Sequence, residues 1–208
     1  MGELIIIILV ILFLLWVFVW EPQAKIVREA KEKENARIRA AKERRQAEKL
    51  AQRRAEQEAL KIERNALLSS TRSKVPGFIL DARLEFEREY RAGKGATSFG
   101  QEMSPLVCFG YRVGKTKGRT LTERRSILKH SIVADLDVSL SFLPTEYRNE
   151  WGEPLSITRF NRIYQHLLSM ADLRDNRRNF EVAVSHWRED AAWFHKEHWT
   201  LVERFKYI

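Results

Sequence analysis

Residues 4–20 read LIIIILVILFLLWVFVW, an apolar run with no polar interruption. An α-helix rises 1.5 Å per residue, so this run would reach about 26 Å, close to the ~30 Å hydrocarbon core of a bilayer. Lipid offers the backbone no hydrogen-bond partners, which favours a helix there. Trp16 and Trp20 lie one turn apart near its C-terminal end, where interfacial tryptophans gather. We therefore predict a transmembrane anchor over residues 1–21, with its apolar part starting at Leu4.

The flanks of this run predict its orientation. A cleaved signal peptide needs a basic start and a small-residue cleavage site, and neither the start MGE nor the exit WEP fits. No Lys or Arg precedes the run, whereas Lys25 and Arg28 follow it closely. The positive-inside rule then predicts a single-pass protein of the inner (plasma) membrane, with the N-terminus outside and the C-terminal part in the cytoplasm.

Residues 22–70 are predicted to form a charged helical stalk. From Lys25 to Leu68 the chain has no Gly or Pro and is dominated by strong helix formers. Large apolar residues do not sustain a heptad seam, so the stalk is a lone helix or a coiled coil, and we favour a spacer that associates with copies of itself. Its basic residues outnumber its acidic ones, but interleaved glutamates argue against a stripe that binds nucleic acid.

Residues 71–208 are predicted to form a small helical domain in the cytoplasm. No run of alternating polar and apolar residues predicts a sheet, so the expected fold class is all-α. Glycine-rich residues 93–118 are predicted as loop, with a short extended piece at 106–111. Apolar residues at helical spacing predict four helices, over 78–91, 121–133, 157–173 and 178–198.

Two of these helices carry recognisable start signals. Thr120 and Glu123 fit a capping box before the second helix, and Ser156 is a suitable N-cap for the third.

The decapeptide FGYRVGKTKG, residues 109–118, contains the GKT of phosphate-binding loops. A P-loop needs four residues between its glycines, so that backbone N–H groups wrap the phosphates. Three residues separate Gly110 from Gly114, and Phe109 occupies the required glycine position. The spacing argues against a nucleotide enzyme, and the glycines are expected to shape a turn that exposes Lys115, Lys117 and Arg119.

Four elements of this region together resemble a small helical domain of prokaryotic proteins whose biochemical role is not assigned. They are GYRVGKT (110–116), LTERRSIL (121–128), EWGEP with Ser156 (150–156) and a late WxxD (187–190). Some proteins with that domain lie among anti-phage or mobile-element genes. The resemblance implies a helical fold and assigns no catalytic residue. Its motif positions are expected to be structural: Gly110, Gly114, Trp151 and Trp187.

Charged residues of these elements are expected to hold the helices together. Ion pairs are predicted between Arg124 and Arg125 on one side and Glu150, Glu153 and Asp190 on the other.

Arg125 and His130 fit the R-x4-H spacing of HEPN-type ribonucleases, which are also small helical domains. In such an enzyme the His acts as acid or base and the Arg stabilises phosphate charge, paired across a dimer. Arg159 and His166 give a looser match. The alternative interpretation is that all four are ordinary helix residues.

Metal or cofactor binding is not predicted. His195 and His198 are spaced i, i+3, but they lack the HExxH pattern of metal-dependent hydrolases. The lone Cys108 is expected to be a buried apolar residue.

The predicted function is binding or assembly at the membrane rather than catalysis. It extends to an oligomerising component of anti-phage defence. Expected partners are the lipid bilayer, further copies of the chain, and a cytoplasmic protein or a nucleic acid. The alternative is a membrane-tethered HEPN-like ribonuclease that uses Arg125 and His130.

Overall fold

The computed structural model describes residues 2–72, 74–93 and 104–208. Within these ranges the secondary structure is helix and turn without any strand, which confirms the all-α prediction. The chain divides into two compact units, Met1–Glu56 and Gln57–Ile208.

The apolar run at the N-terminus is divided between two helical elements. α1 covers Gly2–Leu15, and a five-residue π-helical turn, η1, covers Trp16–Trp20. The residues of η1 are aromatic or β-branched, types that crowd the preceding turn of an α-helix. Taken one at a time, none of the described helices combines the length and the apolar character needed to cross a membrane. The helices of the structure therefore do not support the predicted membrane-spanning helix.

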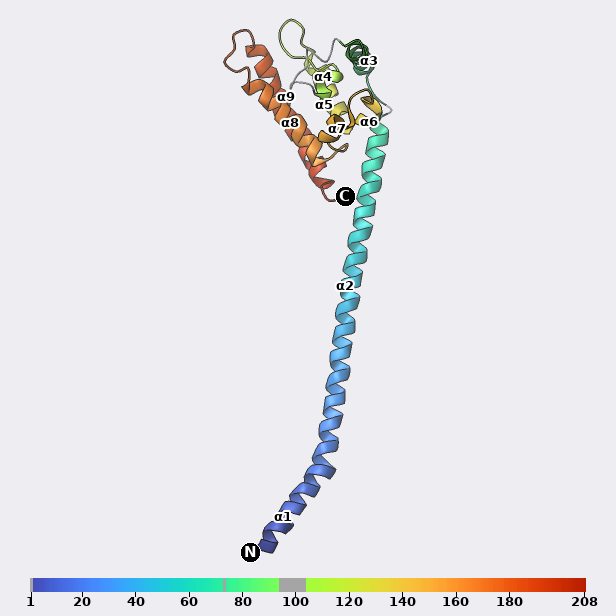
Figure 1. The fold of residues 1–208 in the computed structure, drawn as a ribbon, viewed down its shortest axis with the longest axis vertical. Helices are drawn as coiled ribbons and strands as arrows, with labels where there is room; N and C mark the ends of the chain where they lie inside the picture. The colour runs from blue at the N-terminus through green and yellow to red at the C-terminus, as the bar shows by residue number, and fades with distance from the viewer. Residues whose placement is uncertain (1, 73, 94–103) are drawn as a thin grey trace. The chain divides into compact units, whose positions relative to one another are not determined.

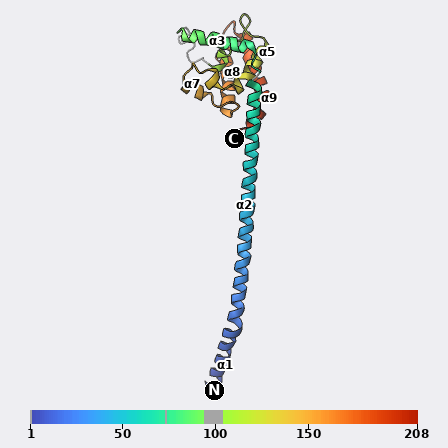
Figure 2. The same ribbon diagram turned by 90° about the vertical axis from the view of Figure 1, so that its right-hand side faces the viewer.

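α2 covers Glu21–Arg72 and contains the whole stretch predicted as a stalk helix. Its end is marked by hydroxyl groups that turn back onto the backbone. Ser70 Oγ and Thr71 Oγ1 both donate to the carbonyl oxygen of Leu67, at 2.9 and 2.8 Å. After a short turn, α3 (Gly77–Arg91) turns away from the end of α2 (Figure 2).

The unit Gln57–Ile208 contains the hydrophobic core. α8 (Ile157–Asp172) and α9 (Glu181–Arg204) lie side by side (Figure 1), and the rings of Phe160 and Phe194 stack between them at 5.1 Å. α5 (Leu121–Val133) packs against both and buries Ile127 and Leu128. The described part of the unit also contains three short helices: α4 (Pro105–Cys108), α6 (Leu136–Ser139) and α7 (Thr145–Glu150).

The last turns of α2 belong to this same unit. Leu60, Leu67 and Leu68 pack against its core. Arg64 Nη2 donates to the carbonyl oxygen of Pro154 at 2.6 Å, and Glu63 pairs with Arg204 at 2.8 Å. The helix predicted as a spacer is therefore, at its C-terminal end, a structural part of the C-terminal unit.

The start signals predicted for the helices are confirmed. α5 has the predicted bounds, and Thr120 and Glu123 make both hydrogen bonds of the capping box. The Ser156 hydroxyl accepts from the backbone N–H of Arg159 at 3.1 Å, at the N-terminus of α8.

Two predictions for this unit are wrong. The extended piece expected at 106–111 is instead the single turn α4, in which Pro105 occupies the first helical position, as proline favours. The last helix continues six residues beyond the predicted end at His198, because Val202 and Phe205 are buried against the core.

Candidate functional site: the His130 cavity

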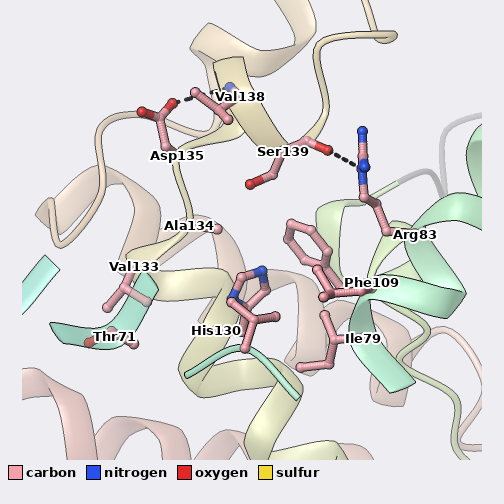
Figure 3. Close-up of a pocket in the computed structure, with 12 residues that line it drawn as sticks. Thr71, Ile79, Arg83, Phe109, His130, Val133, Ala134, Asp135, Val138 and Ser139 are labelled. Carbon is pink, nitrogen blue, oxygen red and sulfur yellow. Dashed lines mark hydrogen bonds between the residues drawn. The ribbon is translucent and has the colours of Figure 1, made fainter. Parts of the chain in front are cut away.

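A cavity of about 310 Å³ opens between α3, α4, α5 and α6, beside the end of α2 (Figure 3). We call it the His130 cavity. This volume is at the small end of the range for ligand pockets, roughly 300–1,000 Å³. The lining is largely apolar and consists of Thr71, Val75, Ile79, Leu80, Arg83, Phe109, His130, Val133, Ala134, Asp135, Val138 and Ser139.

His130 lies in the last turn of α5 and contributes its imidazole to the cavity wall. The rings of His130 and Phe109 meet edge to face, with centroids 4.6 Å apart and an angle of 77° between their planes. Burial lowers the pKa of His130 to about 4, so the ring is neutral at pH 7. A neutral imidazole offers one N–H donor and one acceptor nitrogen. Among the described residues, no hydrogen bond to either nitrogen is made.

The two charged side chains of the cavity, Arg83 and Asp135, already have protein partners. Arg83 Nε donates to the carbonyl oxygen of Ser139 at 2.7 Å, and its Nη2 pairs with Glu87 at 3.0 Å. The Asp135 carboxylate accepts from two backbone N–H groups at the start of α6, at 3.1 and 3.4 Å. Of the charged and imidazole groups that line the cavity, His130 is therefore the one whose hydrogen-bonding atoms are left for a ligand.

The mouth of the cavity is apolar. Leu80 of α3 is 46% exposed and Val138 of α6 is 70% exposed. Apolar side chains at an opening to solvent mark a surface suited to binding. The lining and the mouth together favour a small, neutral and mostly apolar ligand with one hydrogen-bonding group.

The structure places Arg125 against a different part of the unit. Its guanidinium lies 5.0 Å from the ring centre of Trp193 and 3.5 Å from Glu189, both on α9. His130 instead contacts Phe109, the residue after α4, since residues five apart on an α-helix point about 140° away from one another. Within one chain the R-x4-H residues therefore serve separate contacts.

The residues of the looser R/H match have structural contacts. Arg159 is 2% exposed, and its guanidinium donates to the carbonyl oxygens of Trp151 (3.3 Å), Gly152 and Ala134. Burial lowers its pKa to about 10, which leaves it charged at pH 7. His166 meets the buried Trp151 ring edge-on at 6.1 Å. The EWGEP element is therefore a loop that wraps the guanidinium of Arg159, a role that spacing did not reveal.

The predicted ion pair between Arg124 and Asp190 is confirmed. Arg124 Nε lies 2.6 Å from Asp190 Oδ2, and both side chains are buried. The hydroxyl of Tyr111 donates to the same oxygen at 2.7 Å. Arg125 pairs with Glu189, and the described contacts hold no ion pair of either arginine with Glu150 or Glu153. The network joins three of the four sequence elements, GYRVG, TERRS and WxxD.

The glycines of FGYRVGKTKG form a turn, as expected. Gly110 has φ +83°, and a Cβ there would lie 2.6 Å from Cβ of Ala82. Gly114 has φ +105°, and its N–H donates to His186 Nδ1 at 3.4 Å. Arg119, predicted to be exposed, instead lies over the ring of Phe78 at 5.3 Å.

The remaining predicted positions are dispersed. Trp187 is buried, with the guanidinium of Arg174 5.5 Å from its ring centre. Leu4 lies in α1, and Trp16 and Trp20 are the two ends of η1. The Trp16 ring is exposed and lies 6.4 Å from that of Phe13.

The two histidines near the C-terminus have different surroundings. His195 stacks on Trp199 at 5.5 Å, whereas the buried His198 contacts Trp193 and Phe194. In the described ranges no group of three or more metal-ligating side chains gathers.

No family model, curated protein or solved structure matches this chain. A function for this chain is therefore proposed from the geometry of its cavity and its helices.

Proposed function

We propose that this chain is a membrane-anchored binding protein, and that the His130 cavity binds a small, neutral, mostly apolar molecule. The observation that carries the proposal is the neutral imidazole of His130 in an apolar cavity of about 310 Å³. An anion would have to be desolvated near the carboxylate of Asp135, which disfavours it. Recognition is proposed rather than catalysis, because Arg83 and Asp135, the charged side chains of the lining, are held by other protein groups.

The proposed location rests on the N-terminal unit. α1 exposes large apolar side chains along its length, among them Ile6, Leu9, Leu12 and Phe13. Such a surface is unfavourable in water and is favoured in lipid. We propose that the apolar run 4–20 anchors the chain in the membrane, with the positive flank keeping the C-terminal unit in the cytoplasm. Association between copies through α2 belongs to the same proposal.

The ribonuclease alternative gains no specific support. A pKa of about 4 makes His130 a poor proton donor at pH 7, and its ring lies in an apolar cavity. Arg125 is engaged with Glu189 and Trp193.

Two small phenyl compounds test the cavity. The full chain, with ¹³C-labelled histidines and in nonionic detergent, is titrated with 4-methylphenol and with the anion 4-methylbenzoate. NMR signals of His130, assigned by their loss in His130→Phe, report binding. We expect saturable shifts with the phenol and at least about ten-fold weaker binding of the anion, because one unpaired buried charge costs several kcal/mol.

Blocking variants complete the test. Val138→Trp narrows the mouth and should weaken phenol binding by about ten-fold, the equivalent of roughly 1.4 kcal/mol. Val182→Trp places the same side chain on an exposed position of α9, away from the cavity lining, and should leave affinity unchanged. Equal affinities in the two variants would exclude the cavity as the binding site.

A further inference from the structure

We propose that one face of α2 binds the phosphate backbone of double-stranded DNA. The proposal is independent of the cavity and concerns residues within Met1–Glu56. The residues of that face recur at steps of three and four, the spacing of one side of an α-helix. We call them the basic stripe: Arg28, Lys31, Asn35, Arg39, Lys42, Gln46, Lys49 and Arg53.

The basic stripe contains no acidic residue. Between residues 25 and 56 there are twelve Lys and Arg, and six of them belong to the stripe. The other six share the remaining faces with the six glutamates of the same segment. Glutamates border the stripe, such as Glu32 one turn from Arg28 and Glu43 one turn from Arg39, but none of them belongs to the stripe itself. The stripe carries a net charge of +6, and the other faces are balanced.

All residues of the stripe are exposed, and no described contact pairs their charges. An α-helix of 25 residues is about 38 Å long, so six cations lie along a line of that length. Duplex DNA carries about one negative charge per 1.7 Å and completes a turn in roughly 34–36 Å. Its major groove, about 12 Å wide, admits an α-helix between two rows of phosphates.

Other occupants fit this face less well. A helix that lies on a lipid surface needs a continuous apolar face beside its cations. Large apolar side chains that α2 exposes beside the stripe, such as Ile38 and Leu50, lie on opposite edges of it instead. If the same face of a second copy bound here, six cations would lie against six cations, and their repulsion would disfavour the contact. Asn35 and Gln46 add neutral side chains that donate hydrogen bonds to phosphate oxygens. The contacts would be to the backbone, so binding would show little dependence on base sequence.

The experiment compares two triple variants of the full chain in nonionic detergent. Arg39→Gln, Lys42→Gln and Arg53→Gln together remove three charges from the stripe. Lys33→Gln, Arg37→Gln and Arg44→Gln remove three charges of the same types from the opposite face. Glutamine keeps a helix propensity close to that of Lys and Arg, so α2 is preserved in both. Circular dichroism checks this.

Fluorescence anisotropy with a 30-base-pair DNA duplex measures affinity between 50 and 200 mM salt. For the unaltered chain we expect log K to fall with log salt at a slope of about −0.9 per phosphate contacted. The stripe variant should lose at least about ten-fold in affinity at 100 mM salt, and its slope should shrink by about 2.7. The opposite-face variant should lose less than about three-fold.

Three outcomes would overturn the proposal. Equal losses in the two variants would show that net charge, not the stripe, attracts DNA. Tighter binding of duplex RNA, single-stranded DNA or polyglutamate than of duplex DNA would assign the face to another partner. A lack of measurable DNA binding at 50 mM salt would show that the basic stripe is not a DNA-binding surface. Each can occur whether or not 4-methylphenol binds in the His130 cavity.

Discussion

Two buried arginines organise the C-terminal unit at the scale of single residues. Breaking a buried charge pair typically costs about 3–5 kcal/mol, because one charge is left without a partner. Arg124 is held by Asp190, and Arg159 by three backbone carbonyl groups. Each guanidinium thereby fixes a segment that has little regular structure: Asp190 also binds Tyr111 of the glycine-rich turn, and Arg159 holds the loop between α7 and α8.

Two histidines, the buried His198 and the partly buried His130, make stability depend on pH. Burial lowers the pKa of His130 and of His198 to about 4, below the ordinary value of 6.5. Between these values the unfolded chain binds more protons than the folded one, so stability is highest above pH 6.5 and is lost as pH falls toward 4. From pH 7.5 to pH 5.0 we expect a loss of about 1–2 kcal/mol per histidine, measured as a lower urea midpoint by tryptophan fluorescence.

Substitution tests this assignment. His198→Phe keeps an aromatic ring beside Trp193 and Phe194 and should remove about half of the pH dependence. His195→Phe, at an exposed position on the same helix, is the control and should leave the dependence in place. An undiminished dependence in His198→Phe would contradict the assignment.

The residues that the sequence predicts correctly are those with a local signal or an obvious opposite charge. Thr120, Glu123 and Ser156 mark helix starts by signals that span at most four residues. Arg124 and Asp190 carry opposite charges, so their pairing could be predicted. The cavity could not be predicted from the sequence because residues from several separate segments, between Thr71 and Ser139, form its walls. The importance of Arg159 also escapes, since its partners are backbone carbonyls, which every residue has.

Among the helices, length decides what sequence can predict. α5, α8 and α9 are long enough for apolar residues to repeat on one face. α4, α6 and α7 have at most six residues, less than two turns, and show no period. They form because the chain must turn around the core, with local caps such as Asp135 before α6.

The end of α2 provides a prediction at the scale of an element. Removal of residues 1–56 should leave the cooperative unfolding of the C-terminal unit unchanged, because the compact unit starts at Gln57. Removal of residues 1–72 also takes away Leu60, Leu67 and Leu68, whose burial stabilises by roughly 1–2 kcal/mol each. We expect the free energy of unfolding of this shorter chain to be several kcal/mol lower, seen as a lower midpoint in a urea titration. Equal stability of the two truncated chains would show that α2 ends as a free spacer.

At the scale of the whole molecule, the two units contribute different surfaces. The N-terminal unit carries the exposed apolar side chains of α1 and the basic stripe of α2, and the C-terminal unit carries the His130 cavity. These surfaces share no residue. We therefore expect that the proposed membrane anchor, DNA contact and ligand site can each be removed without altering the other two.

The membrane anchor is tested by a charge in the middle of the apolar run. Leu12→Arg places a cation near the centre of residues 4–20, where insertion scales assign a cost of about 2.5–3.5 kcal/mol. We expect the unaltered chain to stay in the membrane fraction after carbonate extraction and the variant to be released in large part. Lys25→Arg, in the polar flank, keeps the charge and should not change the partition. Because the basic stripe and the cavity lie outside the run, the released Leu12→Arg chain should bind duplex DNA and 4-methylphenol as the unaltered chain does. Release of the unaltered chain by carbonate would remove the anchor from the proposed function while leaving both binding sites to be judged on their own measurements.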